Sequence, residues 1–284
     1  MTWTLRYASH LGYRSPDTPL FRECVGSEDP VAHIEFAASL GLAGVQYALA
    51  VTRPKGEVAR VARTLAHHRL EPGCLLYAPR EVLTQPLWGS SAADAREVRE
   101  LHLTRSFAVA QELGARRIAV LSGSDPGRPR TLQHAALIEN LKSAAEKAER
   151  AGVMLCLENL SRRSLPGMLL EHVTEAYAAV TAVASPFVRL IFDTSHVQIM
   201  DGDVLENLRS TWQAIEIIQL ADNPGRGEPG SGELNFANIL RAIHGLGYAG
   251  LIELEHGWTQ TGREVELRGI QSLRELDKAL TRAD

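Results

Sequence analysis

The feature that most constrains the fold is a repeated unit, in which a short apolar run is followed by a longer amphipathic segment. Eight apolar runs, many of them β-branched, are predicted to be strands: Leu5–Ser9, Ala43–Ala48, Gly73–Tyr77, Arg116–Leu121, Val153–Glu158, Val188–Asp193, Ala214–Gln219 and Gly250–Glu255. Strands that are apolar throughout are typical of a parallel sheet buried on both faces. The sequence therefore predicts the α/β class and a (β/α)8 TIM barrel, in a single domain that spans residues 1–284.

The segments between the runs have helical periodicity and end where helices should end. The predicted helices are Glu57–His68, Ala92–Leu113, Thr131–Ala151, Met168–Ala184, Val204–Arg209, Phe236–Leu246 and Glu264–Ala283. Gly41, Gly114, Gly152 and Gly247 each follow a helical pattern and precede a strand, as glycines that terminate helices do. A doubly wound open sheet is the alternative, but no Gly-x-Gly-x-x-Gly segment follows the first strand.

Composition limits the classes of function. Hydrophobic residues make up 45% of the 284 residues and charged residues 23%, which is typical of a globular domain. The net charge of −4 argues against a nucleic-acid partner, and no apolar run is long enough to cross a membrane. The first residues do not resemble a signal peptide, so we expect a cytoplasmic protein. The three cysteines form no metal or disulfide motif, and Cys156 should be a buried, inert thiol.

Four consecutive predicted strands end in a side chain that carries an oxygen ligand. These residues are Glu158, Asp193, Gln219 and Glu255. In a barrel the four strand ends lie on one arc of the same mouth, where active sites form. Three carboxylates directed at one point repel each other unless a cation lies between them. An all-oxygen set favours one divalent ion, Mg²⁺ or Mn²⁺, and His196 could join this set or face the substrate.

Each of these residues also has a structural interpretation. Asp193 could cap a turn or a helix. Glu253 lies on the same strand face as Glu255 and is its rival as a ligand, although Glu255 is nearer the mouth. The glycine-rich loop 222–233 could be an exposed turn, or it could bring Arg226 to a carboxylate or a pair of oxygens.

Several segments together resemble the xylose-isomerase-like TIM-barrel superfamily, and most of all hydroxypyruvate isomerases and related ketose 3-epimerases. They are Leu157–Asn159, Phe192–Gln198, Gln219–Glu233 and Gly247–Glu255. The resemblance implies that Glu158, Asp193, Gln219 and Glu255 bind one divalent metal ion, and that His196 and Arg226 bind substrate. Residues 158–163 depart from the hydroxypyruvate isomerase pattern beside the expected metal, which leaves the substrate open.

The chemistry expected from these residues is an isomerisation. Glu158 and Glu255 would act as catalytic acid and base, moving a proton through a metal-bound enediolate of a small sugar or hydroxy-keto acid. The alternatives are a ketose 3-epimerase, a dehydratase of the inosose or dehydroshikimate type, and a non-catalytic binding protein. An abasic-site endonuclease is disfavoured, because Leu121–Ser124 lacks the histidine that it needs. A homo-oligomer is compatible with the sequence. The roles of His10, Tyr47, Tyr77, Trp88 and His256 stay undecided.

Overall fold

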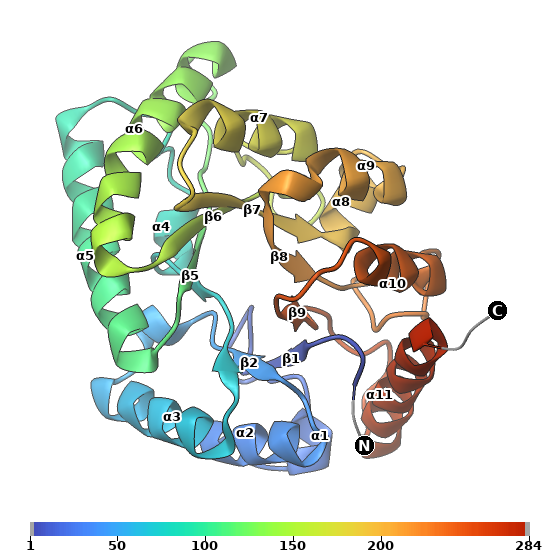
Figure 1. Cartoon of the computed structure of the whole chain (residues 1–284). Helices are drawn as coiled ribbons and strands as arrows, with labels where there is room; N and C mark the ends of the chain where they lie inside the picture. The colour runs from blue at the N-terminus through green and yellow to red at the C-terminus, as the bar shows by residue number, and fades with distance from the viewer. Residues whose placement is uncertain (1–2, 282–284) are drawn as a thin grey trace.

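A computed structural model describes residues 3–281 and shows a closed ring of parallel strands surrounded by helices (Figure 1). The strands are β1 (Tyr7–His10), β2 (Gly44–Gln46), β3 (Glu71–Pro72), β4 (Leu75–Leu76), β5 (Arg117–Val120), β6 (Met154–Glu158), β7 (Val188–Asp193), β8 (Ile215–Gln219) and β9 (Ile252–Glu253). Their order is β3-β2-β1-β9-β8-β7-β6-β5-β4, and every pair is parallel. The predicted α/β barrel is confirmed.

The third strand of the barrel is interrupted, and β3 and β4 together occupy its place. The eight strand positions of the barrel are therefore formed by nine short strands. β3 pairs with β2 and β4 pairs with β5, with Gly73 and Cys74 between them. The Cys74 amide leaves the sheet ladder and donates instead to the Glu253 carboxylate, 2.6 Å away. A Cβ at Gly73 would lie 2.6 Å from Glu253 Oε1 and 2.9 Å from Gln46 Cα, so a side chain there would displace its neighbours. The carboxylate inside the barrel therefore explains the break.

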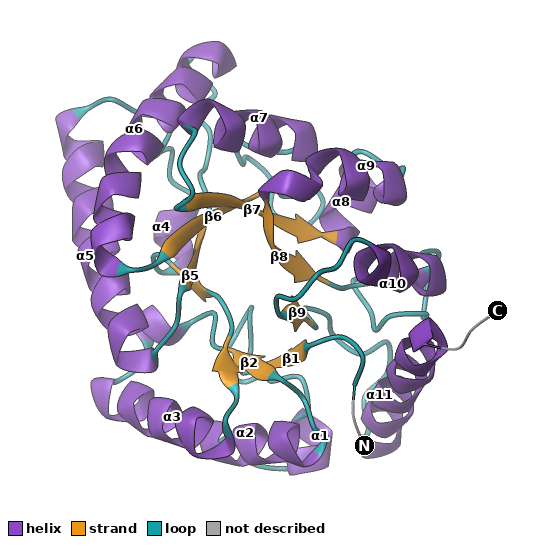
Figure 2. Cartoon of the chain, viewed as in Figure 1, coloured by secondary structure: helices purple, strands orange, loops and turns teal. Residues whose placement is uncertain are grey.

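Eleven α-helices lie in the described residues, most of them in an outer ring (Figure 2). They are α1 (Arg22–Val25), α2 (Pro30–Ser39), α3 (Lys55–His68), α4 (Arg80–Leu83), α5 (Ala93–Leu113), α6 (Arg130–Ala151), α7 (Val173–Val183), α8 (Thr194–Met200), α9 (Val204–Thr211), α10 (Phe236–Gly245) and α11 (Arg263–Lys278). Gly41, Gly114, Gly152 and Gly247 all have positive φ, from 69° to 75°, as the predicted helix ends require.

Two predicted helices differ from the structure by several residues at one end, whereas the other five agree to within two residues. The helix predicted from Met168 begins at Val173, because Met168 bridges to Gly123 and the Leu169 amide donates to Ser122 O. The Glu175 carboxylate then accepts the free amide of His172 at the helix start. The last helix, predicted to end at Ala283, ends at Lys278 and a 3-10 turn follows over Ala279–Thr281, while residues 282–283 of the prediction lie outside the described part.

The barrel interior has a small apolar layer below the mouth. Its residues are Cys74, Ala119, Cys156, Ile191 and Ile217. Three of them lie two residues before Glu158, Asp193 and Gln219, so they point to the same side of their strands. Cys156 is fully buried, as predicted. The residues at the strand ends therefore stand on a packed floor, at the mouth of the barrel.

Candidate active site

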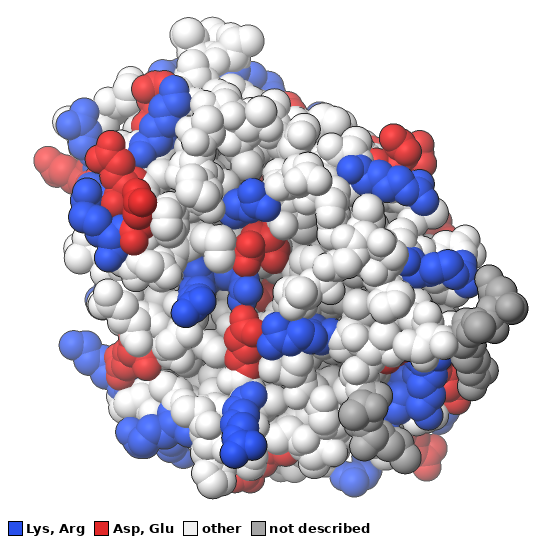
Figure 3. Space-filling view, viewed as in Figure 1, with Lys and Arg blue, Asp and Glu red and all other residues white. Residues whose placement is uncertain are grey.

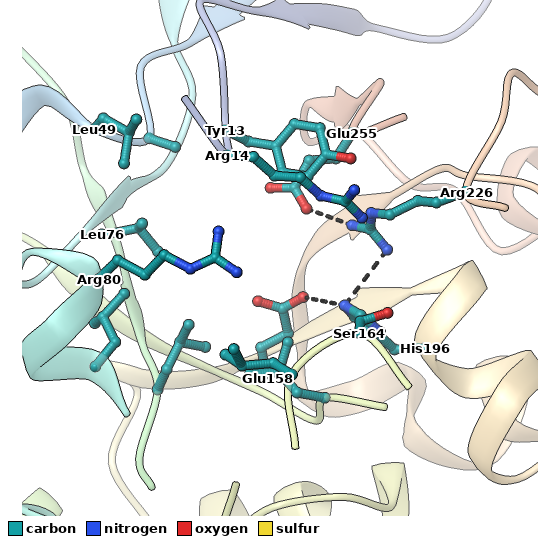
Figure 4. A pocket seen from close by; sticks show the side chains of 15 residues that line it. Tyr13, Arg14, Leu49, Leu76, Arg80, Glu158, Ser164, His196, Arg226 and Glu255 are labelled. Atoms are coloured by element: carbon teal, nitrogen blue, oxygen red, sulfur yellow. Dashed lines mark hydrogen bonds and ion pairs between the residues drawn. The ribbon is translucent and has the colours of Figure 1, made fainter. Parts of the chain in front are cut away.

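A small cavity of about 110 Å³ opens at the carboxyl ends of the strands. Four of the six residues predicted for the site line it: Glu158, His196, Arg226 and Glu255 (Figure 4). Asp193 and Gln219 are buried directly beside them, since Asp193 pairs with Gln219 in the sheet register. The structure thus brings all six together, although they are spread over about a third of the chain.

Glu158 and His196 face each other on one side of the cavity. Glu158 ends β6, and its Oε1 lies 3.6 Å from His196 Nε2. The Ser161 amide points at His196 Nδ1, 3.3 Å away. Arg226 Nη1 lies 3.4 Å from His196 Nε2, so each ring nitrogen faces a group that can only donate. Burial lowers the His196 pKa to about 4, so the ring is neutral at pH 7.

Arg226 connects Asp193 and Glu255 on the other side. Its Nη2 lies 2.6 Å from Asp193 Oδ2 and 2.5 Å from Glu255 Oε2, and its Nη1 lies 3.1 Å from Asp193 Oδ1. Asp193 also accepts the His196 amide at 2.9 Å and so caps α8. The helix-capping interpretation of Asp193 is confirmed, and its role as a metal ligand stays a prediction.

The loop that carries Arg226 is organised by one buried carboxylate. Asp222 accepts backbone N–H groups from four residues at 2.8–3.0 Å: Asn223, Gly230, Gly232 and Leu234. Arg226 itself has a φ of 59°, which is unusual for a residue with a side chain. The loop therefore supports the guanidinium through its own contacts and brings Arg226 to two carboxylates, while residues 224–225 and 230–233 are exposed.

A hydrogen-bonded group of amides and carboxylates lies under Glu255. Gln219 Nε2 is 3.0 Å from both Glu253 Oε2 and Glu255 Oε1. Gln46 Nε2 is 3.0 Å from Glu253 Oε2 and 2.7 Å from Glu255 Oε1. The Oε1 atoms of Gln46 and Gln219 are buried without a hydrogen-bond partner. Glu253 does not line the cavity, whereas Glu255 does.

The site fits a divalent cation. Glu158, Asp193 and His196 offer ligand atoms within 4.8 Å of one another, the one such group of acidic, histidine or cysteine side chains in residues 3–281. The unpartnered Gln219 oxygen adds an acceptor at the level of Asp193. Carboxylate and amide oxygens suit hard cations, and a histidine is compatible with several metals.

Burial shifts the acid–base properties of the carboxylates. Burial, together with the charges of Glu255 and Asp193, raises the pKa of Glu158 well above its usual range. Burial also raises the Glu255 pKa, to about 7, although Arg226 opposes the shift. For Asp193 burial works in the same direction, but Arg226 and His196 outweigh it and the pKa is lowered. Three adjacent acids thus have different proton affinities, as sites of proton transfer commonly do.

Three cavity residues were not predicted from the sequence. Tyr13, Arg14 and Arg80 line the cavity, and the Tyr13 ring lies 5.4 Å from the Arg226 guanidinium (Figure 4). Each of them follows a strand end by a few residues, after β1 or β4, which is the signal that could have identified them. In the part of the chain described, neither Arg14 nor Arg80 forms an ion pair.

The five residues left undecided lie outside this cavity. The His10 ring accepts the Gly12 amide and contacts His256 O at 3.1 Å, so it joins β1 to the segment after β9. His256 lines a neighbouring cavity, and Tyr47 donates to Glu57. The rings of Tyr77 and Trp88 pack edge to face in the core, 5.7 Å apart.

The family of the chain follows from comparison with known proteins. Residues 34–276 match the family model described as xylose isomerase-like TIM barrel, and the chain belongs to that family. It is 28% identical over 254 residues to hydroxypyruvate isomerase of Escherichia coli K12, covering 88% of this chain and 95% of that protein. It is 31% identical over 261 residues to a protein of Homo sapiens named putative hydroxypyruvate isomerase, covering 89% of each. These relatives are isomerases, and the chain is an enzyme of that class.

A solved structure with the same fold has a title that names a different activity. The crystal structure titled AP endonuclease, family 2, from Brucella melitensis has a TM-score of 0.80 and 26% identity, covering 95% of this chain and all of that one.

On the face shown in Figure 3, basic and acidic groups are interspersed and do not form one broad basic patch. None of the helices described here has the length and apolarity of a membrane span.

Proposed function

We propose that the chain is an isomerase of a small hydroxy-keto acid, similar to hydroxypyruvate isomerase. The observation that carries the proposal is the pair of carboxylates, Glu158 and Glu255, which come from β6 and from the segment after β9 and line one cavity (Figure 4). A substrate bound between them has a proton acceptor on either side. The isomerase names of the relatives that cover nearly all of the chain support this choice.

The proposed reaction conserves every atom of the substrate. One carboxylate takes a proton from the carbon that bears the hydroxyl, and the C–H electrons form the double bond of an enediolate. A proton is then delivered to the neighbouring carbon. The hydroxyl proton moves from the oxygen of the first carbon to the oxygen of the neighbouring carbon, so the carbonyl forms at the first carbon and a hydroxyl at its neighbour. His196 lines the cavity beside Glu158 and is placed to contact the oxygen that gains charge. Positioned acids and bases of this kind contribute about 10²–10⁴-fold each.

We further propose that Glu158, Asp193, Gln219 and Glu255 hold one divalent cation, Mg²⁺ or Mn²⁺. Support comes from Glu158 and Asp193, whose ligand atoms lie within 4.8 Å of each other, and from the unpartnered Gln219 oxygen. Glu255 is added because it shares the Arg226 guanidinium with Asp193. When bound, such an ion polarises a carbonyl and acidifies the neighbouring C–H group.

The charges at the cavity favour an acid over a neutral ketose. Arg226 is compensated by Asp193 and Glu255, but Arg14 and Arg80 bring positive charge without a described ion-pair partner. Guanidinium groups bind carboxylates through two parallel hydrogen bonds. The cavity of about 110 Å³ supports a substrate of a few carbon atoms.

Proton exchange tests the mechanism. The protein is incubated with Mn²⁺ or Mg²⁺ and hydroxypyruvate in D₂O, and the products are identified by NMR. We expect deuterium next to the carbonyl, and at least a roughly 10²-fold loss of rate in Glu158→Gln and in Glu255→Gln. Glu171→Gln, a buried glutamate outside the cavity, is the matched control. Full exchange in both cavity variants would contradict the mechanism. An epimerised or dehydrated product would show that the protein is an epimerase or a dehydratase and not an isomerase of this type.

Substrate selectivity tests the two arginines. Arg80→Gln and Arg14→Gln should each raise KM for hydroxypyruvate about tenfold, the equivalent of about 1.4 kcal/mol, with a smaller change in kcat. Exposed Arg63 on α3 lies outside the cavity, so Arg63→Gln should leave KM unchanged. Unchanged KM in both cavity variants would remove the argument for an acid.

A further inference from the structure

Glu253 is a buried acid that the proposed reaction does not use, and it is fully engaged as an acceptor. Its Oε1 receives the Cys74 amide at 2.6 Å. Its Oε2 receives the amide nitrogens of Gln46 and Gln219, each at 3.0 Å, and the Cys74 thiol at 3.1 Å. The Glu253 carboxylate lies beside the interruption of the third strand, and its Oε1 would be 2.6 Å from a Cβ at position 73, where the chain has glycine.

The two glutamine amides are oriented by these contacts. A side-chain amide has a donor end and an acceptor end, and a carboxylate accepts only from the donor end. Glu253 and Glu255 both draw the Nε2 groups of Gln46 and Gln219, so their Oε1 atoms turn the other way. Both Oε1 atoms are buried and unpartnered, which is costly unless a ligand uses them.

We propose that Glu253 is a positioning residue that holds the Gln219 amide with its oxygen free for the divalent cation of the mouth. Gln219 lies in register with Asp193 on one side and with Glu253 on the other. Its nitrogen is shared between Glu253 and Glu255, 3.0 Å from each, so its oxygen is the end left for the cation. The inference rests on the proposed cation site and adds to it the group that orients one of its ligands. Gln46 is held by Glu253 in the same way, from β2.

The substitution Glu253→Gln tests the orientation without changing the size of the side chain. The new amide must still offer its oxygen to the Cys74 N–H, so its nitrogen faces Gln46 and Gln219. Two donors cannot pair, so the Gln219 nitrogen keeps only Glu255 as an acceptor. The amide then has less to hold its orientation, and we expect it to turn its NH₂ group towards the cation in part of the molecules. Loss of a group that orients a metal ligand typically weakens binding 10–100-fold. We expect the Kd for Mn²⁺, measured by electron paramagnetic resonance of the free ion, to rise by that factor.

A second substitution separates orientation from general damage. In the double variant Gln219→Glu/Glu253→Gln, the new carboxylate accepts from the new amide with one oxygen and still offers the other to the cation. Mn²⁺ binding should recover to within about threefold of the wild type, relative to the expected 10–100-fold loss. Cys74→Ala removes the thiol, which lies 3.1 Å from Glu253 and 3.3 and 3.9 Å from the amide nitrogens of Gln46 and Gln219, but leaves the Glu253 carboxylate in place. Because the carboxylate still accepts from both amides, this variant should bind Mn²⁺ as the wild type does.

The outcomes distinguish the inference from the cation site itself. A wild-type protein that does not bind Mn²⁺ overturns both. Wild-type binding with an unchanged Kd in Glu253→Gln, or weak binding without recovery in the double variant, overturns the positioning role alone. If Glu253→Gln does not fold, as judged by circular dichroism, Glu253→Asp replaces it. This variant keeps the charge but shortens the reach to the amides, and unaltered Mn²⁺ binding in it contradicts the inference equally.

Discussion

At the scale of single residues, Arg226 is a buried cation that contacts two carboxylates and two aromatic rings. Its guanidinium is buried between Asp193 and Glu255, lies 3.4 Å from the His196 ring nitrogen, and lies over the Tyr13 ring. The sequence predicted that this residue binds substrate. The structure shows that it also supplies the positive charge which lets two buried carboxylates lie side by side. A residue on a glycine-rich loop thus stabilises the ends of β7 and β9.

We predict that Arg226→Gln destabilises the protein in the presence of a chelator. Removing one partner of a buried ion pair costs about 3–5 kcal/mol, because the remaining charges lose their compensation. Added Mn²⁺ should restore much of this loss, since it brings positive charge to the same carboxylates. Urea unfolding with EDTA and with Mn²⁺ measures both effects. Equal stability of the variant and the wild type in EDTA would show that the ion pairs contribute little.

At the scale of elements, the loops at the carboxyl ends of the strands decide the shape of the site. The loop 222–233 is held by four backbone N–H groups that donate to Asp222, and a Cβ at Gly232 would lie 1.9 Å from Asn223 O. The strands place Glu158, Asp193 and Gln219 by periodicity alone. The loop instead places Arg226 through contacts within itself, which a periodic pattern does not reveal.

We predict that Asp222→Ala impairs catalysis through Arg226. Four backbone donors lose their acceptor, the loop loosens, and the guanidinium loses its fixed position. Misplacement of a positioning group by about 1 Å costs up to about 10²-fold, so kcat/KM should fall at least tenfold. Ser231→Ala, an exposed change in the same loop, is the control and should have wild-type activity. Limited proteolysis should cut the loop faster in Asp222→Ala only, and wild-type kcat/KM in that variant would refute the prediction.

At the scale of the whole molecule, the two ends of the barrel differ in how their charges are arranged. The mouth gathers carboxylates that repel one another, whereas the other end is closed by ion pairs between strand starts. Arg117 of β5 lies 2.5 Å from Glu71 of β3 and 2.8 Å from Glu216 of β8. Arg6, just before β1, lies 2.8 Å from Glu71. These contacts join strands from four parts of the ring, so we expect them to stabilise the closed barrel.

We predict that this network contributes to acid lability. Burial works to raise the Glu71 pKa, but hydrogen bonds from Arg117 and Arg6 outweigh it and the pKa is lowered. The stabilisation is therefore complete above the unfolded-state pKa of about 4.3 and is lost as the pH falls through the lower folded-state value. Glu71→Gln should lower Tm at pH 7 and reduce its fall in acid. Glu139→Gln, on an exposed pair, should leave the profile unchanged, and a parallel acid profile in Glu71→Gln would contradict the prediction.

The sequence by itself determined the class of fold and most members of the site. Apolar strands, helix-ending glycines and polar residues at strand ends are local signals, and the barrel brings equivalent strand ends together whatever lies between them. Glu158, Asp193, Gln219 and Glu255 could be named for this reason, whereas His196 and Arg226 received their expected roles from the resemblance of their segments to the family. Only the tertiary structure decided which groups pair. It placed Arg226 on two carboxylates, Arg14 and Arg80 at the cavity, and Glu253 below Gln219, because these contacts join segments whose distance depends on side-chain packing.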